Sequence, residues 1–259
     1  MSYLEALILG LVQGLTEFLP VSSSGHIEIV KGLFGTELKE GLLTTVVLHV
    51  GTALSTLLVF RKTILELIQG LFRWESDAVK FSGFILVSMI PAGVIGLLFE
   101  DELEALFSGN LLLVGFCLLI TAVLLFVSER VPTGNSKVGL KDAIVIGLAQ
   151  AFAILPGVSR SGSTIATGLL LKIDKEKATR FSFLMVLPVI IGATGIKALK
   201  IDAETMAGME LGPLAVAFIS SFLAGWIACV AMLKIVRKKK LVWFAAYCAL
   251  VGVLGIIFG

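Results

Sequence analysis

The sequence predicts an all-α polytopic membrane protein with two inverted-topology repeats, each made of one re-entrant helical hairpin followed by three transmembrane helices. Three observations indicate this fold class. Only 15% of the 259 residues are charged and 57% are hydrophobic, whereas an average soluble domain has about 25% charged residues. The chain contains several apolar stretches of bilayer length, and its mean hydropathy is +1.02. Finally, one polar motif occurs twice.

The apolar stretches are long enough to cross a bilayer, which takes about 20 residues, with a range of about 17 to 25. They are residues 41–60, 81–99, 111–127, 181–199, 213–236 and 241–258. The N-terminal segment has no basic residues before its apolar run, so we expect no cleaved signal peptide. Residues 1–259 should therefore form a single integral membrane domain, a multi-pass protein of the cell (plasma) membrane.

The repeated motif reads ALILGLVQGLTEFLPVSSSG at residues 6–25 and AIVIGLAQAFAILPGVSRSG at residues 143–162. The matched pairs are Gly10 and Gly147, Gln13 and Gln150, Pro20 and Pro156, and, after one inserted residue at Gly157, Ser22 and Ser159. Self-similarity of this kind indicates internal repeats. We assign about residues 1–130 to the first repeat and about residues 137–259 to the second.

Each copy of the motif begins as a helix of about four turns, which Pro, Ser and Gly then interrupt before a crossing is complete. Interrupted apolar segments at matching positions of two halves are typical of re-entrant helices around a site near the bilayer midplane. Non-helical backbone at that depth is tolerated only inside protein or beside a water-filled cavity. We therefore expect two re-entrant hairpins whose tips meet inside the protein.

Basic residues predict the orientation, because short cytoplasmic loops are enriched in Lys and Arg. Segments 61–80, 128–142, 172–180 and 237–240 are basic, whereas segments 100–110 and 201–212 are acidic. The basic segments should be cytoplasmic, which places both termini and the first hairpin outside and lets the second hairpin enter from the cytoplasm. An odd number of crossings in each repeat makes the repeats inverted. The site should open to the extracytoplasmic face.

The first helix carries polar groups on one face, because Gly10, Gln13, Gly14 and Glu17 follow i, i+3, i+4, i+7 spacing. An ionisable group at the bilayer centre costs at least about 2.5 kcal/mol on insertion scales, so a functional role is the default interpretation of Glu17. The alternative is a carboxylate that snorkels to the surface. Gln13 and Gln150 are candidates for packing by hydrogen bonds across the internal two-fold axis.

The segment 21–26, Val-Ser-Ser-Ser-Gly-His, combines hydroxyls, backbone N–H groups and an imidazole. Such turns bind anions, and a hydroxyl beside His and Glu can be an activated nucleophile. In the second copy Arg160 replaces Ser23, and its planar guanidinium suits bidentate phosphate binding. One hairpin then supplies acid/base groups and the other a cation, as phosphoryl transfer requires. A structural ion pair between Glu17 and Arg160 is the alternative.

Both motifs resemble those of the undecaprenyl-pyrophosphate phosphatase family of the bacitracin-resistance type. The matching segments are QGLTE at residues 13–17, PVSSSGH at residues 20–26 and PGVSRSGST at residues 156–164. The resemblance implies a membrane enzyme that hydrolyses undecaprenyl (polyprenyl) pyrophosphate to the monophosphate and inorganic phosphate, with a divalent cation, Mg²⁺ or Ca²⁺. This reaction recycles the lipid carrier for peptidoglycan and other cell-envelope glycans.

The resemblance also implies roles for individual residues. The implied catalytic residues are Glu17 and His26 for acid/base or metal chemistry, Ser23 as candidate nucleophile and Arg160 for holding the pyrophosphate. The implied substrate-binding residues are Ser22, Ser24, Gly25, Ser159, Ser161, Gly162 and Thr164, and the implied metal ligands are Gln13 and Glu17. Since Gln13 is a neutral amide, the carboxylate role falls to Glu17. The nucleophile stays open between Ser23, an activated water and His26.

A lipid-phosphate flippase or secondary transporter is the alternative function, because inverted repeats with re-entrant hairpins are also transporter architecture. The Ser/His/Glu set facing Arg favours hydrolysis, since transport does not require all of it. A type-2 phosphatidic acid phosphatase does not fit, because Ala166 stands where such enzymes have a nucleophilic His. We expect His49 to be a packing or supporting group and Lys197 to snorkel.

The expected partners are the polyprenyl pyrophosphate substrate and membrane lipids. A formal net charge of +2 is too small to indicate nucleic-acid binding. The sequence leaves the oligomeric state open, with a homodimer as one option.

Overall fold

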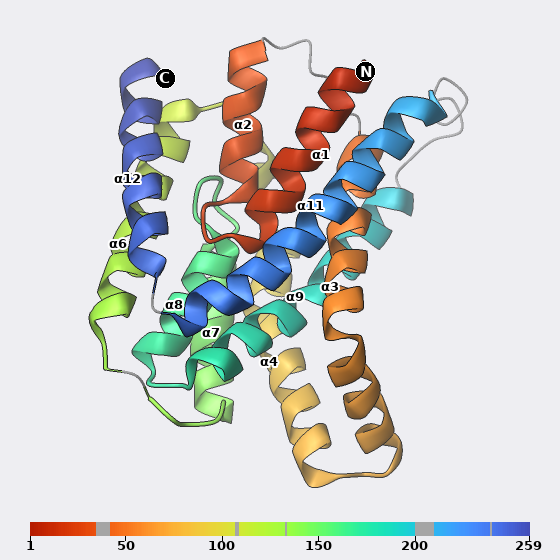
Figure 1. Cartoon of the computed structure of the whole chain (residues 1–259), viewed down its shortest axis with the longest axis vertical. Coiled ribbons are helices and arrows are strands. Elements are labelled where there is room, and N and C mark those ends of the chain that lie inside the picture. Colours follow the sequence, from red (N-terminus) through yellow and green to blue (C-terminus); the bar gives the residue numbers. More distant parts are fainter. Residues whose placement is uncertain (35–41, 107–108, 133, 200–209, 239) are drawn as a thin grey trace.

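The computed structural model of the chain is built from α-helices (Figure 1) and describes residues 1–34, 42–106, 109–132, 134–199, 210–238 and 240–259. Six helices in these ranges are long and apolar enough to cross a membrane. They are α3 (Leu42–Phe72), α4 (Ser76–Leu98), α6 (Leu111–Arg130), α9 (Lys175–Leu199), α11 (Leu211–Arg237) and α12 (Leu241–Phe258). The all-α polytopic fold and the six predicted crossings are therefore confirmed.

Some segments that were expected to be loops are helical. Helix α3 continues past Phe60 to Phe72, so a short turn at residues 73–75 joins it to α4. The extension is helical because Ile64 and Leu67 keep helical spacing and pack against the main core. The acidic segment after α4 contains the short helix α5 (Glu100–Leu106). Most of the expected acidic loop 201–212 lies outside the described residues.

Two helical hairpins fill the space between the crossings. The first consists of α1 (Tyr3–Phe18) and α2 (Ser23–Phe34), and the second of α7 (Leu140–Phe152) and α8 (Arg160–Leu170). Figure 1 shows the first hairpin in the upper half and the second in the lower half, with their turns meeting at mid-height. The tips touch, since Ser161 Oγ donates to Leu19 O at 3.1 Å. The predicted meeting of the hairpins is therefore observed.

The first helix of each hairpin packs against a crossing from the other half of the chain, α1 on α11 and α7 on α4. Glycine makes both approaches close. A Cβ at Gly10 would lie 2.6 Å from Ala217 O, and a Cβ at Gly147 would lie 2.5 Å from Ser88 O. In the predicted repeats α1 corresponds to α7 and α11 to α4, so the α1–α11 and α7–α4 contacts are equivalent. The two-fold relation of the complete halves stays a prediction.

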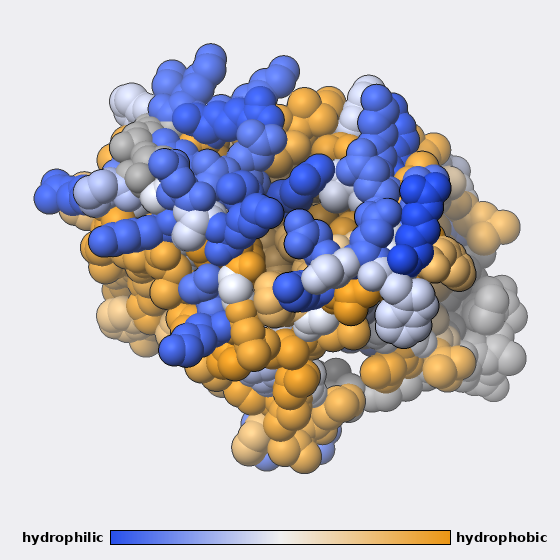
Figure 2. All heavy atoms as spheres, turned by 90° about the horizontal axis from the view of Figure 1, so that it is seen from below, coloured by the Kyte–Doolittle hydropathy of each residue, from blue (hydrophilic) through white to orange (hydrophobic). Residues whose placement is uncertain are grey.

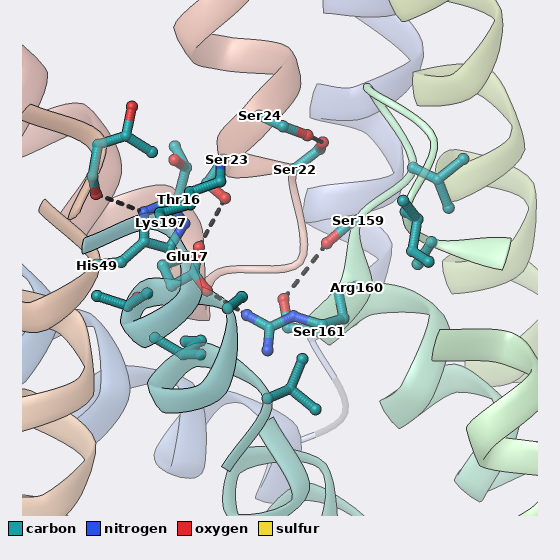
Figure 3. Close-up of a pocket in the computed structure, with 18 of the residues that line it drawn as sticks. Thr16, Glu17, Ser22, Ser23, Ser24, His49, Ser159, Arg160, Ser161 and Lys197 are labelled. Atoms are coloured by element: carbon teal, nitrogen blue, oxygen red, sulfur yellow. Dashed lines mark hydrogen bonds and ion pairs between the residues drawn. The ribbon is translucent and has the colours of Figure 1, made fainter. Parts of the chain in front are cut away.

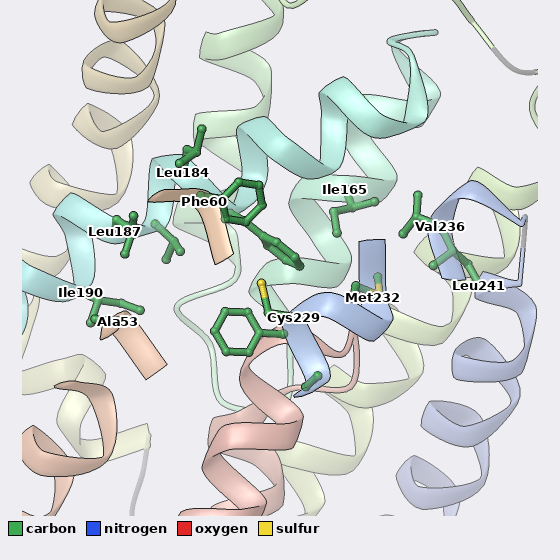
Figure 4. Close-up of a cluster of buried hydrophobic side chains, with 14 of the residues drawn as sticks. Ala53, Phe60, Ile165, Leu184, Leu187, Ile190, Cys229, Met232, Val236 and Leu241 are labelled. Carbon is green, nitrogen blue, oxygen red and sulfur yellow. The ribbon is translucent and has the colours of Figure 1, made fainter. Parts of the chain in front are cut away.

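The largest apolar cluster lies next to the hairpin tips (Figure 4) and draws side chains from α3, α8, α9 and α11. The ring of Phe183 packs edge-on against Phe18 and Phe60, with centroids 5.6 and 6.1 Å apart. Phe18 is 2% exposed, so this packing anchors the last turn of α1. It thereby holds the neighbouring Glu17 in place.

The face seen from below in Figure 2 carries hydrophilic side chains over part of its area. The α3–α4 turn lies there, and both termini lie at the opposite end (Figure 1). Arg237 from α11 pairs with Glu176 from α9 at 2.6 Å, and Lys137 pairs with Asp77 at 3.6 Å. Charged side chains at the ends of the crossings are expected where helices leave a membrane.

Candidate active site

The hairpin tips border one cavity with a volume of about 240 Å³. Its polar lining comes from the first hairpin, the second hairpin, α3 and α9 (Figure 3). These residues are Thr16, Glu17, Ser22, Ser23, Ser24, Thr45, His49, Ser159, Arg160, Ser161, Thr194 and Lys197. Polar groups far apart in the sequence thus share one cavity inside an apolar protein.

Glu17 links the two hairpins. Its Oε2 accepts hydrogen bonds from Ser23 Oγ at 2.7 Å and from Gln13 Nε2 at 3.1 Å. Its Oε1 accepts from Arg160 Nη2 in an ion pair. The Glu17 side chain is only 5% exposed, so this set of donors replaces the water that a carboxylate needs. Three of the predicted catalytic residues are therefore connected, since Ser23 and Arg160 each contact Glu17 directly.

Arg160 is more open than its partner, since 22% of its side chain is exposed. One guanidinium nitrogen is engaged by Glu17, and Figure 3 shows the group on the cavity wall. A guanidinium has several N–H donors in a fixed fork, so Arg160 can hold Glu17 and an anion together. The observed ion pair and a role in anion binding are thus compatible.

The first tip is shaped by Ser22, whose φ of 71° lies in the left-handed region that non-glycine residues rarely adopt. Ser22 Oγ accepts from Gly25 N–H at 3.3 Å, in the manner of an N-cap residue. Ser22 O accepts from the His26 backbone N–H at 3.2 Å. The next residue, Ser23, opens α2 with its hydroxyl against Glu17. The distorted turn thus aims that hydroxyl at the carboxylate.

The second tip is built on Ser159, the N-cap of α8, whose Oγ accepts from Gly162 N–H at 3.1 Å. Its own N–H donates to Thr121 Oγ1 on α6 at 2.9 Å. Arg160 follows at the first position of the helix, so its direction is set by a rigid cap. The carboxylate and the guanidinium are therefore both presented by tightly held turns.

Comparison with known proteins identifies the family of the chain. The sequence model of the family described as "Bacitracin resistance protein BacA" matches residues 6–254. The chain belongs to the BacA family. A relative named undecaprenyl-diphosphatase from Christiangramia forsetii is 53% identical, over 100% of this chain and 98% of the relative. Relatives with the same name from Bacteroides fragilis and Methanobrevibacter smithii are 51% and 38% identical, over 99% and 98% of this chain and 98% and 96% of the relatives.

Five of the predicted residues of the BacA motifs lie away from the cavity wall. Gln13 is buried on α1, where its Nε2 donates to Glu17 Oε2 at 3.1 Å. A Cβ at Gly25 would lie 3.0 Å from Gly157 Cα, and one at Gly162 would lie 3.3 Å from Pro20 Cβ, so both glycines serve the contact between the tips. Thr164 Oγ1 is engaged by Ser182 Oγ at 2.6 Å. His26 faces α12, where its Nε2 lies 2.7 Å from Tyr247 Oη.

Two ionisable cavity residues of this BacA protein were not predicted as site residues. His49 on α3 lines the cavity beside Glu17, with its Nδ1 2.8 Å from Thr45 O (Figure 3). Lys197, in the last turn of α9, lines it as well instead of only snorkelling. Both could have been predicted from the sequence, because an ionisable side chain inside a membrane crossing usually has a functional role.

Proposed function

We propose that the chain is an undecaprenyl-diphosphatase, a membrane enzyme that hydrolyses a polyprenyl pyrophosphate to the monophosphate and inorganic phosphate. The observation that carries this assignment is the contact of Ser23, Glu17 and Arg160 inside one cavity. A hydroxyl against a carboxylate, opposite a guanidinium, supplies nucleophile, base and charge stabilisation for phosphoryl transfer. Relatives that align with this chain over 98% of their own length are named undecaprenyl-diphosphatase. A flippase does not require this contact.

In the proposed reaction Ser23 Oγ attacks the terminal phosphorus while Glu17 Oε2, 2.7 Å away, accepts the hydroxyl proton. An O–P bond forms to Ser23, and the bond from the bridging oxygen to the terminal phosphorus breaks. The lipid monophosphate leaves with both electrons of that bond. Glu17 passes its proton to the oxygen of the departing monophosphate and is a carboxylate again. Water then attacks the phosphoserine, Glu17 takes a proton from this water and gives it to Ser23 Oγ as the O–P bond breaks, and inorganic phosphate is released. Ser23 returns to its starting state.

Positive charge in the cavity stabilises the negative charge of the pyrophosphate and of the oxygen that leaves. Among the lining residues that the structure describes, Arg160 and Lys197 are the cations and Glu17 is the carboxylate. Arg160 lies at the reacting end, where its fork can hold terminal phosphate oxygens as the bond breaks. Lys197 is placed to meet the rest of the pyrophosphate.

The residues also fit a divalent cation. Gln13 Oε1 is buried without a hydrogen-bond partner within the described structure, and its amide already touches Glu17. Oxygen ligands of this kind suit Mg²⁺ or Ca²⁺, and Mg²⁺ commonly takes only one or two carboxylates plus substrate phosphates. The described residues contain no cluster of three or more His, Cys, Asp or Glu for a metal. Gln13 and Glu17 would hold the ion, which would supply charge neutralisation on the pyrophosphate.

The cavity should open to the extracytoplasmic face. Its lining includes Val189, Ala193, Thr194 and Lys197, which run along α9 toward its C-terminal end. That end of α9 lies in the same half of the molecule as the termini (Figure 1). The basic connections lie toward the other end, which the enrichment of Lys and Arg assigns to the cytoplasm.

The test is phosphate release by purified protein given undecaprenyl pyrophosphate in detergent with Mg²⁺ or Ca²⁺. We expect turnover by the wild type and its loss in Arg160→Met, with Arg237→Met, a change of another ion-paired arginine, as the matched control. Movement of the intact lipid across proteoliposomes without phosphate release would instead favour a flippase. Full turnover by Arg160→Met would overturn the assigned role of the guanidinium.

A further inference from the structure

His26 sits behind the first hairpin tip and is tied on both sides. Its Nδ1 lies 2.8 Å from Ser22 O, and its Nε2 lies 2.7 Å from Tyr247 Oη on α12. A carbonyl oxygen only accepts, so Nδ1 carries the proton and, in the neutral ring, Nε2 accepts the tyrosine hydroxyl. The two rings also stack, with centroids 5.5 Å apart and planes at 10°. Tyr247 thus fixes both the orientation and the tautomer of the imidazole.

The other end of this chain of contacts is the strained turn. Ser22 O accepts from both the backbone N–H and Nδ1 of His26. Ser22 holds a φ of 71°, a strained conformation that persists only when its surroundings enforce it. The turn in turn directs Ser23 Oγ to Glu17. A residue on the last crossing is therefore linked to the nucleophile through two hydrogen bonds.

We propose that the Tyr247–His26 pair is a positioning device that holds the Ser22 turn and aims Ser23 at Glu17, and that His26 performs no proton transfer to substrate. This inference deepens the proposed phosphatase function and rests on it. The imidazole has no free nitrogen to offer in this arrangement, and it is absent from the cavity lining. His26 therefore acts through the backbone of Ser22.

Substitution at His26 separates positioning from acid/base chemistry. In His26→Asn the amide nitrogen takes roughly the place of Nδ1 and can still donate to Ser22 O, but the side chain has no titratable group. We expect kcat to fall by less than about tenfold, the scale of one weakened hydrogen bond. His26→Ala should lose at least about 100-fold because the turn relaxes. Loss of a true acid/base group would cost about 10²- to 10⁴-fold in both variants.

Tyr247→Phe tests the other end of the pair, because it keeps the stacked ring and removes the hydroxyl. We expect kcat to fall about two- to tenfold with little change in KM, as for loss of one neutral hydrogen bond. Asn at position 26 is too short to reach α12, so adding Tyr247→Phe to His26→Asn should cause no further loss. Tyr3→Phe, at the exposed start of α1, is the matched control.

Three readouts decide between the roles. The pH profile of kcat should keep its shape in His26→Asn, and the thermal midpoint should drop in His26→Ala more than in His26→Asn. A His26→Asn enzyme as inactive as His26→Ala, or one that has lost a limb of the pH profile, would overturn the proposal. So would additive losses in the double variant. Absence of turnover in the wild type would refute the phosphatase assignment instead, and the order of thermal midpoints would still test the positioning role.

Discussion

The two hairpins share a backbone plan and differ in the chemistry that they carry. In both, the first serine of the tip caps the following helix, Ser22 through Gly25 N–H and Ser159 through Gly162 N–H. In both, it also lies 3.3 Å from the hydroxyl of a second serine two residues on. These matched contacts support the alignment of the motifs. The repeat therefore preserves the cap and leaves the neighbouring positions free to diverge.

Divergence occurs at the positions that face the cavity. Ile154 occupies the place of Glu17 in the motif alignment, and it lines the same cavity. Arg160 occupies the place of Ser23. The second hairpin thus lacks the carboxylate and gains the cation. Two copies of one turn can form a composite site because opposite charges attract across the join, whereas two identical acidic tips would repel each other.

The largest expected effect is that of the nucleophile Ser23, and a serine of the second hairpin, Ser161, serves as its control. Ser23→Ala removes the attacking hydroxyl and should lower kcat by at least about 10⁴-fold. Ser161→Ala removes the hydrogen bond to Leu19 O and the contact with Ser159 Oγ, neither of which involves the attacking hydroxyl, and should cost less than about tenfold. Single-turnover phosphate release measures both. Equal losses in the two variants would contradict the division of labour between the hairpins.

A smaller loss, about 10³-fold in kcat, is expected for Glu17→Gln, because the amide keeps the shape but cannot accept the Ser23 proton. Ile154→Gln puts the same side chain at the matching position of the other hairpin and should cost less than about tenfold, since no proton transfer is lost. Steady-state kinetics on undecaprenyl pyrophosphate compare the two. The interpretation of Glu17 as the base fails if the Glu17→Gln enzyme keeps wild-type kcat.

Much of the fold was predictable from local pattern. Apolar stretches of bilayer length identify the crossings, and the duplicated Gln and Val-Ser-x-Ser-Gly positions identify two tips that must meet. The C-terminal end of α3 was not predictable from charge, because Arg61 and Lys62 are exposed on a helix that continues through apolar spacing. Charged residues mark a membrane boundary without ending a helix.

The site was predictable where neighbours in sequence are neighbours in space. The link from Glu17 to Ser23 follows from one tight turn, and the link to Arg160 follows from the repeat. The direction of His26 depends on Tyr247, which lies 221 residues away, and no spacing rule reports such a contact. His49 and Lys197 reach the cavity through the packing of α3 and α9, which their own apolar sequences do not specify.

The tips also differ in how strictly they need glycine. Gly157, the extra residue of the second tip, has a φ of 98°, and a Cβ there would lie 2.5 Å from Val114 O. Gly157→Ala should lower the free energy of unfolding by about 3 kcal/mol, the sum of left-handed strain and overpacking. Gly25→Ala, whose Cβ would meet its nearest atom at 3.0 Å, should cost about 1 kcal/mol. Thermal unfolding in detergent ranks the two, and the reverse order would contradict the close packing of the second tip.

The smallest expected effect concerns a residue outside both hairpins. Lys197 contributes a charge that Glu17 does not neutralise, so Lys197→Met should raise KM for the pyrophosphate about two- to fivefold and leave kcat nearly unchanged, as for a partly solvated ion pair. Lys197→Arg should restore most of the affinity, and Lys62→Met, an exposed lysine of α3, is the control. Added salt should shrink the difference because it screens the interaction. A lower kcat at constant KM would mean that Lys197 acts on the reacting phosphate. A charged catalytic residue would then lie on α9, outside both hairpins.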